Sequence, residues 1–134
     1  MILPTRYLTV GDVVRFTRIF PDGPYDVRDA GLLALAVQRP QLQVLGADAY
    51  PDLPRKAAAL LHSIVRTRPL VDGNERTALL AALAMLHLNG TGVGATSPRA
   101  GLALTRDVAQ GSLDDVPEIA ARLLALVDRG LGGD

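Results

Sequence analysis

The run from Ala78 to Leu86, an unbroken series of apolar residues, constrains the fold of this chain most strongly. It belongs to a longer stretch of helix-forming residues, from Asn74 to His87, and it presents apolar side chains on every face of a helix. A helix of that kind belongs in the centre of a bundle, surrounded by other helices. Asn89-Gly90 directly after the stretch predicts its C-terminal cap.

Proline and glycine divide the rest of the chain into five more helical segments, at about residues 10–19, 28–38, 52–67, 98–110 and 116–129. Strand character is confined to Leu42, Gln43, Val44 and Leu45, and a lone short strand cannot build a sheet. We therefore expect residues 41–51 to form an ordered loop or a small β-flap. The prediction is an all-α protein, a compact six-helix bundle around a buried central helix, in a single domain of residues 1–134.

Composition narrows the class of protein. A chain of 134 residues can bury a core without metals or disulfides, and the absence of cysteine excludes a disulfide framework and a thiolate metal site. A formal net charge of zero argues against direct nucleic-acid binding. Neither a signal peptide nor a membrane-spanning run is recognisable. We expect a soluble, cytoplasmic protein with no membrane partner.

The turn Asp72-Gly73-Asn74 feeds directly into the apolar helix, so that free backbone N–H groups lie at the positive end of the helix dipole. Arg76 in the first helical turn and Arg68 before the loop add cationic side chains. This arrangement predicts an anion site, with phosphate as its most natural ligand. Asp72 can hold a divalent cation such as Mg²⁺, while Arg76 can bind phosphate oxygens with two donors.

The spacing of these residues alone does not decide between a ligand-binding turn and a plain capped turn. Gly73 permits a positive φ or the close approach of a ligand. The Asn74 side chain can cap the helix or turn outward to a ligand. The simpler alternative is a plain capped turn in a structural helical domain.

The segment from Arg68 to Ala78 resembles the signature of the Fic/Doc family, and specifically its short Doc branch. That signature is His-x-Phe-x-Asp/Ala-Gly/Ala-Asn-Lys-Arg, commonly followed by Thr-Ala and a hydrophobic helix that ends in Asn-Gly. The matching residues are Asp72, Gly73, Asn74, Arg76, Thr77, Ala78, Asn89 and Gly90. Residues 29–33 and 49–53 extend the resemblance beyond the motif.

The resemblance implies an all-helical enzyme that transfers a phosphoryl or AMP group from ATP, or another nucleoside triphosphate, to a protein hydroxyl with the help of Mg²⁺. For the Doc branch it implies the toxin of a toxin–antitoxin system. The target is then a threonine of elongation factor Tu, so that translation is inhibited. The implied partner is a Phd-like antitoxin.

The same resemblance assigns roles to individual positions. Asp72 becomes the Mg²⁺ residue, and Gly73, Asn74, Glu75 and Arg76 become the nucleotide- and phosphate-binding positions. Residues 42–51, with Leu42, Gln43, Val44 and Leu45, become the flap that docks the target segment.

Two departures from the signature bear on activity. Arg68 occupies the position of the general-base histidine, and arginine stays protonated at physiological pH. Loss of general-base help typically costs about 10²–10⁴-fold in rate. His62 lies roughly 9 Å before that position along its helix and His87 at the far end of the next, so neither is expected to replace the base.

The second departure is Glu75, which occupies the position of the signature lysine. It is expected to weaken phosphate binding, to pair with Arg68 or Arg76, or to provide a second oxygen for the metal. Whether the chain is an active enzyme therefore stays open, and we expect impaired catalysis with retained binding. Three explanations of Arg68 are open. It is a laboratory substitution, or the chain is a natural relative that is inactive or repurposed, or the chain is a catalyst with altered chemistry. The alternative function is a non-catalytic module that binds a nucleotide or an antitoxin.

Overall fold

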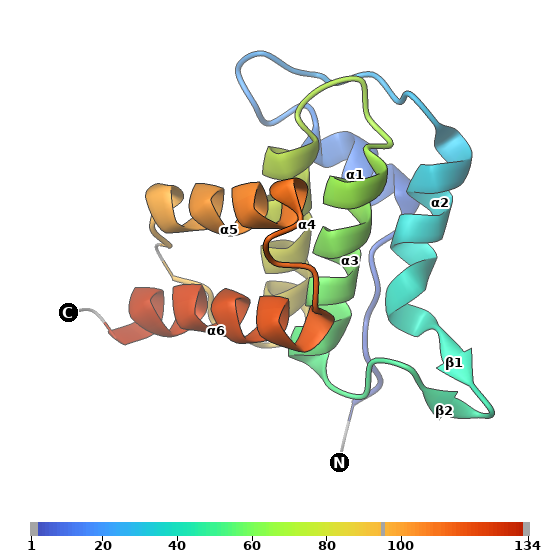
Figure 1. The fold of residues 1–134 in the computed structure, drawn as a ribbon, viewed down its shortest axis with the longest axis vertical. Helices are drawn as coiled ribbons and strands as arrows, with labels where there is room; N and C mark the ends of the chain where they lie inside the picture. The colour runs from blue at the N-terminus through green and yellow to red at the C-terminus, as the bar shows by residue number, and fades with distance from the viewer. Residues whose placement is uncertain (1–2, 95, 133–134) are drawn as a thin grey trace.

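The computed structural model describes residues 3–94 and 96–132, with side chains described up to residue 127. It contains the helices α1 (Val10–Phe16), α2 (Ala30–Gln38), α3 (Leu53–Thr67), α4 (Asn74–Leu88), α5 (Pro98–Gln110) and α6 (Val116–Gly132). A 3₁₀ turn, η1 (Arg39–Gln41), and two short strands, β1 (Gln43–Val44) and β2 (Ala47–Asp48), lie between α2 and α3. The predicted all-α, six-helix fold is confirmed (Figure 1).

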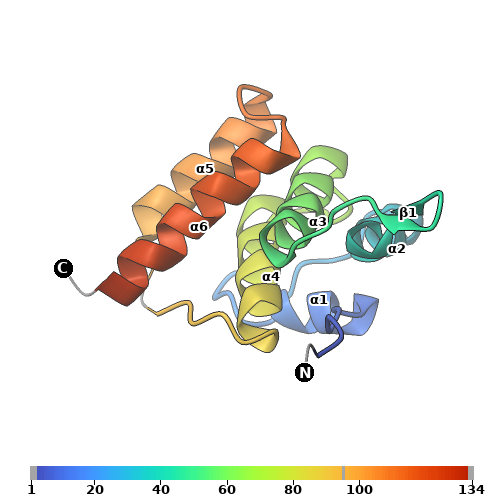
Figure 2. The ribbon, with the colours of Figure 1, turned by 90° about the horizontal axis from the view of Figure 1, so that it is seen from below.

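Helix α3 is the most thoroughly surrounded element. It contacts α2, η1, α4, α5 and α6, and nine of its fifteen residues are buried. Helices α5 and α6 lie side by side on one flank of the α3–α4 pair, and α2 lies on the other (Figure 2). A buried helix at the centre of the bundle is therefore present, but α3 holds that place rather than the helix of residues 74–87.

Helix α4 is buried along one side only. Ala78, Ala81, Ala82, Met85 and Leu86 are buried, and α4 contacts α1, α3 and α5. Leu79, Leu80 and Leu83 border an open groove of about 370 Å³, here called the α4–α5 groove. The apolar residues of this groove include Ile19, Phe20, Leu79, Leu80, Leu83 and Leu102. The apolar residues of α4 thus divide into two sets, one packed in the core and the other lining this groove.

Two helix ends differ from the sequence prediction for local reasons. The first helix ends at Phe16 rather than Ile19, because the hydroxyl of Thr17 donates to the carbonyl of Val14 and the chain continues in tighter i→i+3 turns. The second begins at Ala30 rather than Arg28, because Asp29 is its N-cap and accepts the N–H of Leu32.

The predicted C-terminal cap of α4 is confirmed at Asn89, with Gly90 behind it at φ 93°. The Asn89 side chain also accepts the N–H of Arg6 (2.7 Å) and donates to its carbonyl (2.8 Å). These bonds tie the N-terminal segment to the end of α4.

The small β-flap expected at residues 41–51 is an antiparallel hairpin with Gln43 opposite Asp48. Its turn, Leu45-Gly46, has positive φ at both residues, as a type I′ hairpin turn requires. Lys56 anchors the hairpin from α3, because its ammonium group donates to the carboxylate of Asp48 (3.1 Å). The hairpin is thus a fixed structure rather than a loose loop.

Among the described residues, no helix combines the length and the apolar character that a membrane crossing requires.

Candidate phosphate-binding site

The loop between α3 and α4 is held by the connection that precedes α2. The carbonyl of Pro69 accepts the N–H groups of Arg28 (2.7 Å) and Asp29 (3.0 Å). The N–H of Val71 donates to the carbonyl of Asp26 (2.8 Å). This short backbone pairing joins segments about forty residues apart and fixes the path of the loop.

Arg68 stands at the end of α3 in a left-handed conformation, with φ 53° and ψ 60°. The guanidinium of Arg28 donates to the carbonyls of Thr67 (2.8 Å) and Arg68 (2.7 Å), which holds this turn in place. A non-glycine residue in this conformation costs about 1–3 kcal/mol and is often found at functional sites. The exposed side chain of Arg68 is thereby directed from a well-defined point of the backbone.

The buried side chain of Asn74 closes the loop. Its amide oxygen accepts the N–H of Leu70 (2.9 Å), and its amide nitrogen donates to the carbonyl of Leu70 (2.9 Å). The side chain is only 3% exposed, so it neither caps α4 nor points outward to a ligand. Asn74 thus supports the loop from inside, and its sequence-based assignment as a phosphate-binding position stays a prediction.

Gly73 occupies the N-cap position of α4 with φ 72° and ψ 20°. The ring of Tyr25 packs against it so closely that a Cβ at this position would lie 2.0 Å from Cε2 of the ring. Both the conformation and the space therefore require glycine. The first helical hydrogen bond runs from Thr77 to the carbonyl of Gly73 (3.0 Å), which leaves the N–H groups of the first turn for a ligand.

These elements enclose a predominantly polar cavity of about 380 Å³ at the N-terminal end of α4, here called the polar cavity. Its lining residues are Asp22, Tyr25, Arg68, Asp72, Gly73, Asn74, Glu75, Arg76, Leu102 and Arg106. The structure thus brings together Arg68, Asp72, Glu75 and Arg76, as the sequence predicts, and it adds residues from the α1–α2 connection and from α5.

Arg76 is held by a small network. Its guanidinium donates to the carboxylate of Asp22 (3.2 Å) and to the hydroxyl of Tyr25 (3.4 Å), and Tyr25 donates to Asp22 (2.7 Å). The hydrogen bond from Tyr25 lowers the pKa of Asp22, while burial raises the pKa of Tyr25. Asp22 is then a stable anion and Tyr25 a stable phenol, so neither is tuned to act as a general base near neutral pH.

Two carboxylates of the polar cavity, those of Asp72 and Glu75, make no ion pair with any described residue. Asp72 is exposed, and one of its oxygens accepts the N–H of Gly73 (2.7 Å). No group of three metal-ligating side chains occurs among the described residues. Mg²⁺ typically takes one or two carboxylates and completes its shell with phosphates and water, which is the set that Asp72 can join. Glu75 lines the same cavity as Asp72, in the first turn of α4.

Neither histidine lines the polar cavity. The Nε2 atom of His62 lies 2.7 Å from a carboxylate oxygen of Asp114, and its Nδ1 lies 2.7 Å from the guanidinium of Arg39. Since a guanidinium only donates, Nδ1 accepts and the proton of the neutral ring faces Asp114. His62 is therefore a structural residue, as expected, and His87 lies near the opposite end of α4.

The hairpin of residues 43–48 does not contribute to the polar cavity. It precedes α3, whereas the loop of residues 68–73 follows it, so the two lie at opposite ends of that helix (Figure 1). Fifteen helical residues span about 22 Å. Leu42, Val44 and Leu45 are exposed, but this position does not support the predicted role of Leu42, Gln43, Val44 and Leu45 in presenting a target segment to the loop.

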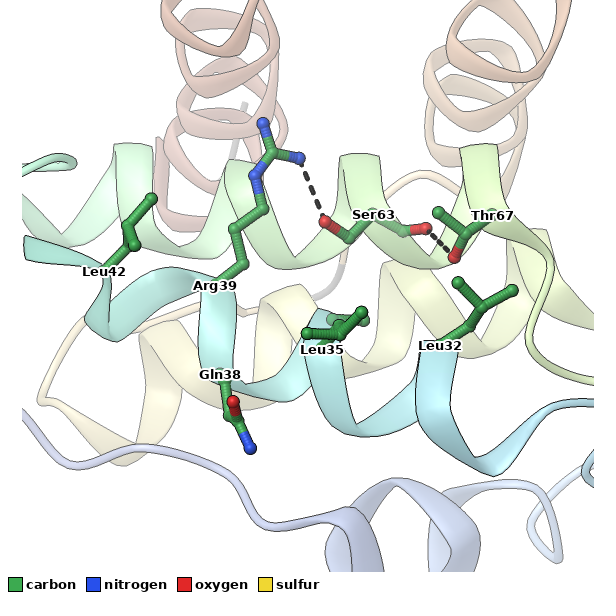
Figure 3. A pocket seen from close by; sticks show the side chains of 8 residues that line it. Leu32, Leu35, Gln38, Arg39, Leu42, Ser63 and Thr67 are labelled. Carbon is green, nitrogen blue, oxygen red and sulfur yellow. Dashed lines mark hydrogen bonds between the residues drawn. The ribbon is translucent and has the colours of Figure 1, made fainter.

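A second, mostly apolar cavity of about 380 Å³ runs along α2 and α3 from Leu42 to Thr67 (Figure 3). Leu32 and Leu35 form much of its wall. The polar groups of its floor are satisfied within the protein, since Ser63 accepts from Arg39 (3.0 Å) and Thr67 donates to the carbonyl of Ser63 (2.6 Å). This cavity offers apolar surface rather than an anion site.

Sequence reasoning missed four residues of the polar cavity: Asp22, Tyr25, Leu102 and Arg106. They lie about 30 to 50 residues from the turn in either direction, and no local pattern marks them. The spacing of Leu102 and Arg106 by one helical turn predicts that they share a face of α5, but not what that face meets.

The chain is similar to known proteins over a stretch that includes the loop between α3 and α4. The Fic/DOC family matches residues 7–86, which include the loop and the first turns of α4. Toxin Doc of Mycolicibacterium smegmatis is 55% identical over 86 residues, covering 64% of this chain and 66% of that protein. The match thus spans just under two thirds of the relative.

Replacement of Gly73 tests the contact with Tyr25. Gly73→Ala is expected to lower the free energy of unfolding by about 1–3 kcal/mol more than Gly90→Ala, measured by urea denaturation. Both glycines have positive φ at a helix boundary, but a Cβ at Gly90 meets open space. Equal losses for the two variants would contradict the close packing of Tyr25.

Replacement of Asn74 separates a supporting role from ligand binding. Asn74→Ala is expected to destabilise the protein by about 1–3 kcal/mol, because the buried N–H and carbonyl of Leu70 lose their partner. Asn89→Ala is the matched control, and it should cost less because the backbone of Arg6 is exposed. If Asn74→Ala left the stability unchanged but abolished nucleotide binding, the Asn74 side chain would be a ligand-binding group rather than a support of the loop.

Proposed function

Because the chain belongs to the Fic/DOC family, we propose that it is a Doc-type toxin of a toxin–antitoxin system. Its parent reaction is the transfer of a phosphoryl or AMP group from ATP, or another nucleoside triphosphate, to a protein hydroxyl. The name of its Mycolicibacterium smegmatis relative supports the toxin class. A threonine of elongation factor Tu is the proposed target, and the cytoplasm is the proposed site of action.

One observation carries this proposal: the polar cavity places Asp72, Arg76 and the first turn of α4 around a common space. The N–H groups of that turn and the guanidinium of Arg76 are suited to phosphate oxygens. Asp72 is suited to Mg²⁺, which would neutralise phosphate charge when bound. The volume and the donors support a nucleotide as the ligand.

The transfer needs a proton acceptor. In phosphoryl transfer the hydroxyl oxygen of the target bonds to the γ-phosphorus, the bond from this phosphorus to the bridging oxygen breaks, and ADP leaves. In AMP transfer the same attack falls on the α-phosphorus, and pyrophosphate leaves. In both cases the proton of the hydroxyl must move to a base.

The present chain lacks a suitable base at the expected position. Arg68 stands at the left-handed turn where the family signature has histidine, and its guanidinium remains protonated. His62 is engaged elsewhere, and Asp22 and Tyr25 titrate away from neutrality. We therefore propose that catalysis is impaired, while binding through Asp72 and Arg76 is retained.

A Phd-like antitoxin is the proposed protein partner. The α4–α5 groove supplies the apolar surface that a peptide partner needs, and Glu75, Arg76 and Leu102 line both this groove and the polar cavity. A peptide seated in the groove would therefore lie directly beside the nucleotide. This proximity supports inhibition by obstruction of the cavity.

Restoring the base is the direct test of the proposed reaction. Arg68→His is expected to slow growth on expression and to raise the labelling of a protein by radioactive ATP by about 10²-fold or more, as general-base help typically does. Label retained from the γ-position indicates phosphoryl transfer, and label retained from the α-position indicates AMP transfer.

Two control variants sharpen this comparison. Arg68→Gln removes the positive charge without adding a base, so it should remain inactive. Arg68→His combined with Asp72→Asn should lose the restored activity, because the metal residue is gone. If Arg68→His neither slows growth nor labels any protein, the proposed reaction is wrong.

Arg68 itself favours a second candidate function, a module that binds a nucleotide or an antitoxin without catalysis. Here the chain as it stands should bind ATP in the presence of Mg²⁺ without consuming it. Isothermal calorimetry combined with an assay for ADP, AMP and pyrophosphate measures both properties. An absence of binding at millimolar ATP would contradict this function.

A further inference from the structure

Helix α5 contributes Leu102 and Arg106 to the lining of the polar cavity, which the first turn of α4 also lines. Gly101 lets the two helices approach closely, since a Cβ there would lie 2.5 Å from a methyl carbon of Leu79. At the other end of α5, the guanidinium of Arg66 donates to the carbonyl of Ala109 (3.2 Å). The backbone that carries Arg106 is therefore fixed at both sides, while the Arg106 side chain itself is exposed and lines the cavity.

The charge of Arg106 has no internal partner among the described residues. The neighbouring Asp107 is engaged by Arg122 (2.7 Å), and Asp22 is engaged by Arg76 (3.2 Å). Arg68 likewise makes no ion pair within the described part of the chain. The polar cavity thus has two guanidinium groups without an ion pair among the described residues, Arg68 at the end of α3 and Arg106 on α5.

Glu75 opposes phosphate binding on the α4 wall. It brings a carboxylate into the first turn of the helix, next to the N–H groups that face the cavity. A single phosphate held only at that turn would meet this negative charge. An anion with several charged groups can also engage Arg106, which lines the same cavity from α5.

We propose that Arg106 is a phosphate-binding residue that offsets Glu75 and gives the site its preference for polyphosphate over monophosphate nucleotides. This inference rests on the proposed nucleotide site. Arg106 binds the phosphate chain from α5, while the N–H groups of the α4 turn and Arg76 are the donors from α4.

Calorimetry of the full chain with ATP, ADP, AMP and inorganic tripolyphosphate in the presence of Mg²⁺ tests this assignment. Arg106→Ala is expected to weaken the binding of ATP and tripolyphosphate about tenfold or more, since charge-assisted hydrogen bonds are lost, and to change AMP binding much less. Arg106→Lys should recover part of the loss. Arg99→Ala is the matched control, because Arg99 is exposed on the same helix and does not line the cavity.

A second comparison tests the link to Glu75. In a Glu75→Lys background the wall of α4 carries its own cation, so Arg106→Ala should weaken ATP binding by less than in the original chain. An equal loss in both backgrounds, or a loss no larger than that of Arg99→Ala, would overturn the assignment while ATP binding itself stands. No binding of any nucleotide by the unchanged chain would overturn the proposed nucleotide site together with it.

Discussion

The candidate site depends on the two hydrogen bonds between the buried amide of Asn74 and the backbone of Leu70. They close the loop in front of α4, whose first turn lines the polar cavity. The contact of Gly73 with Tyr25 fixes the same turn from its other side. Because both restraints are buried or sterically strict, the N-terminal end of α4, the proposed anion site, has a fixed conformation without a ligand.

The sequence predicts this site through local chemistry and misses what the fold adds. An Asp-Gly-Asn turn followed by helix-forming residues is sufficient to predict free N–H groups, and Arg68 and Arg76 lie close enough in sequence to join them. The inward direction of Asn74 is decided by burial of the Leu70 backbone, which no spacing reveals. Asp22, Tyr25 and Arg106 reach the cavity only through the packing of the α1–α2 connection and α5 against α4.

The fold shows the same division between local and long-range effects. Helices and their caps follow from residues such as Thr9, Asp52 and Ser97, whose side chains bond to nearby N–H groups. The hairpin is likewise predicted from a short strand-like run, but its place at the far end of α3 is a property of the assembled bundle. The apolar character of α4 predicts burial, whereas the structure divides its leucines between the core and the α4–α5 groove.

The proposed ligand of the first turn of α4 is the phosphate chain of a nucleotide. The most direct measurement is a titration of isotopically labelled protein with ATP and Mg²⁺, followed through the backbone amide resonances in NMR spectra. The largest shifts are expected at the amides of Gly73, Glu75 and Arg76, with little change in the hairpin of residues 43–48. Saturating shifts confined to the cavity between α2 and α3, or an absence of shifts at the α4 turn, would contradict the claim.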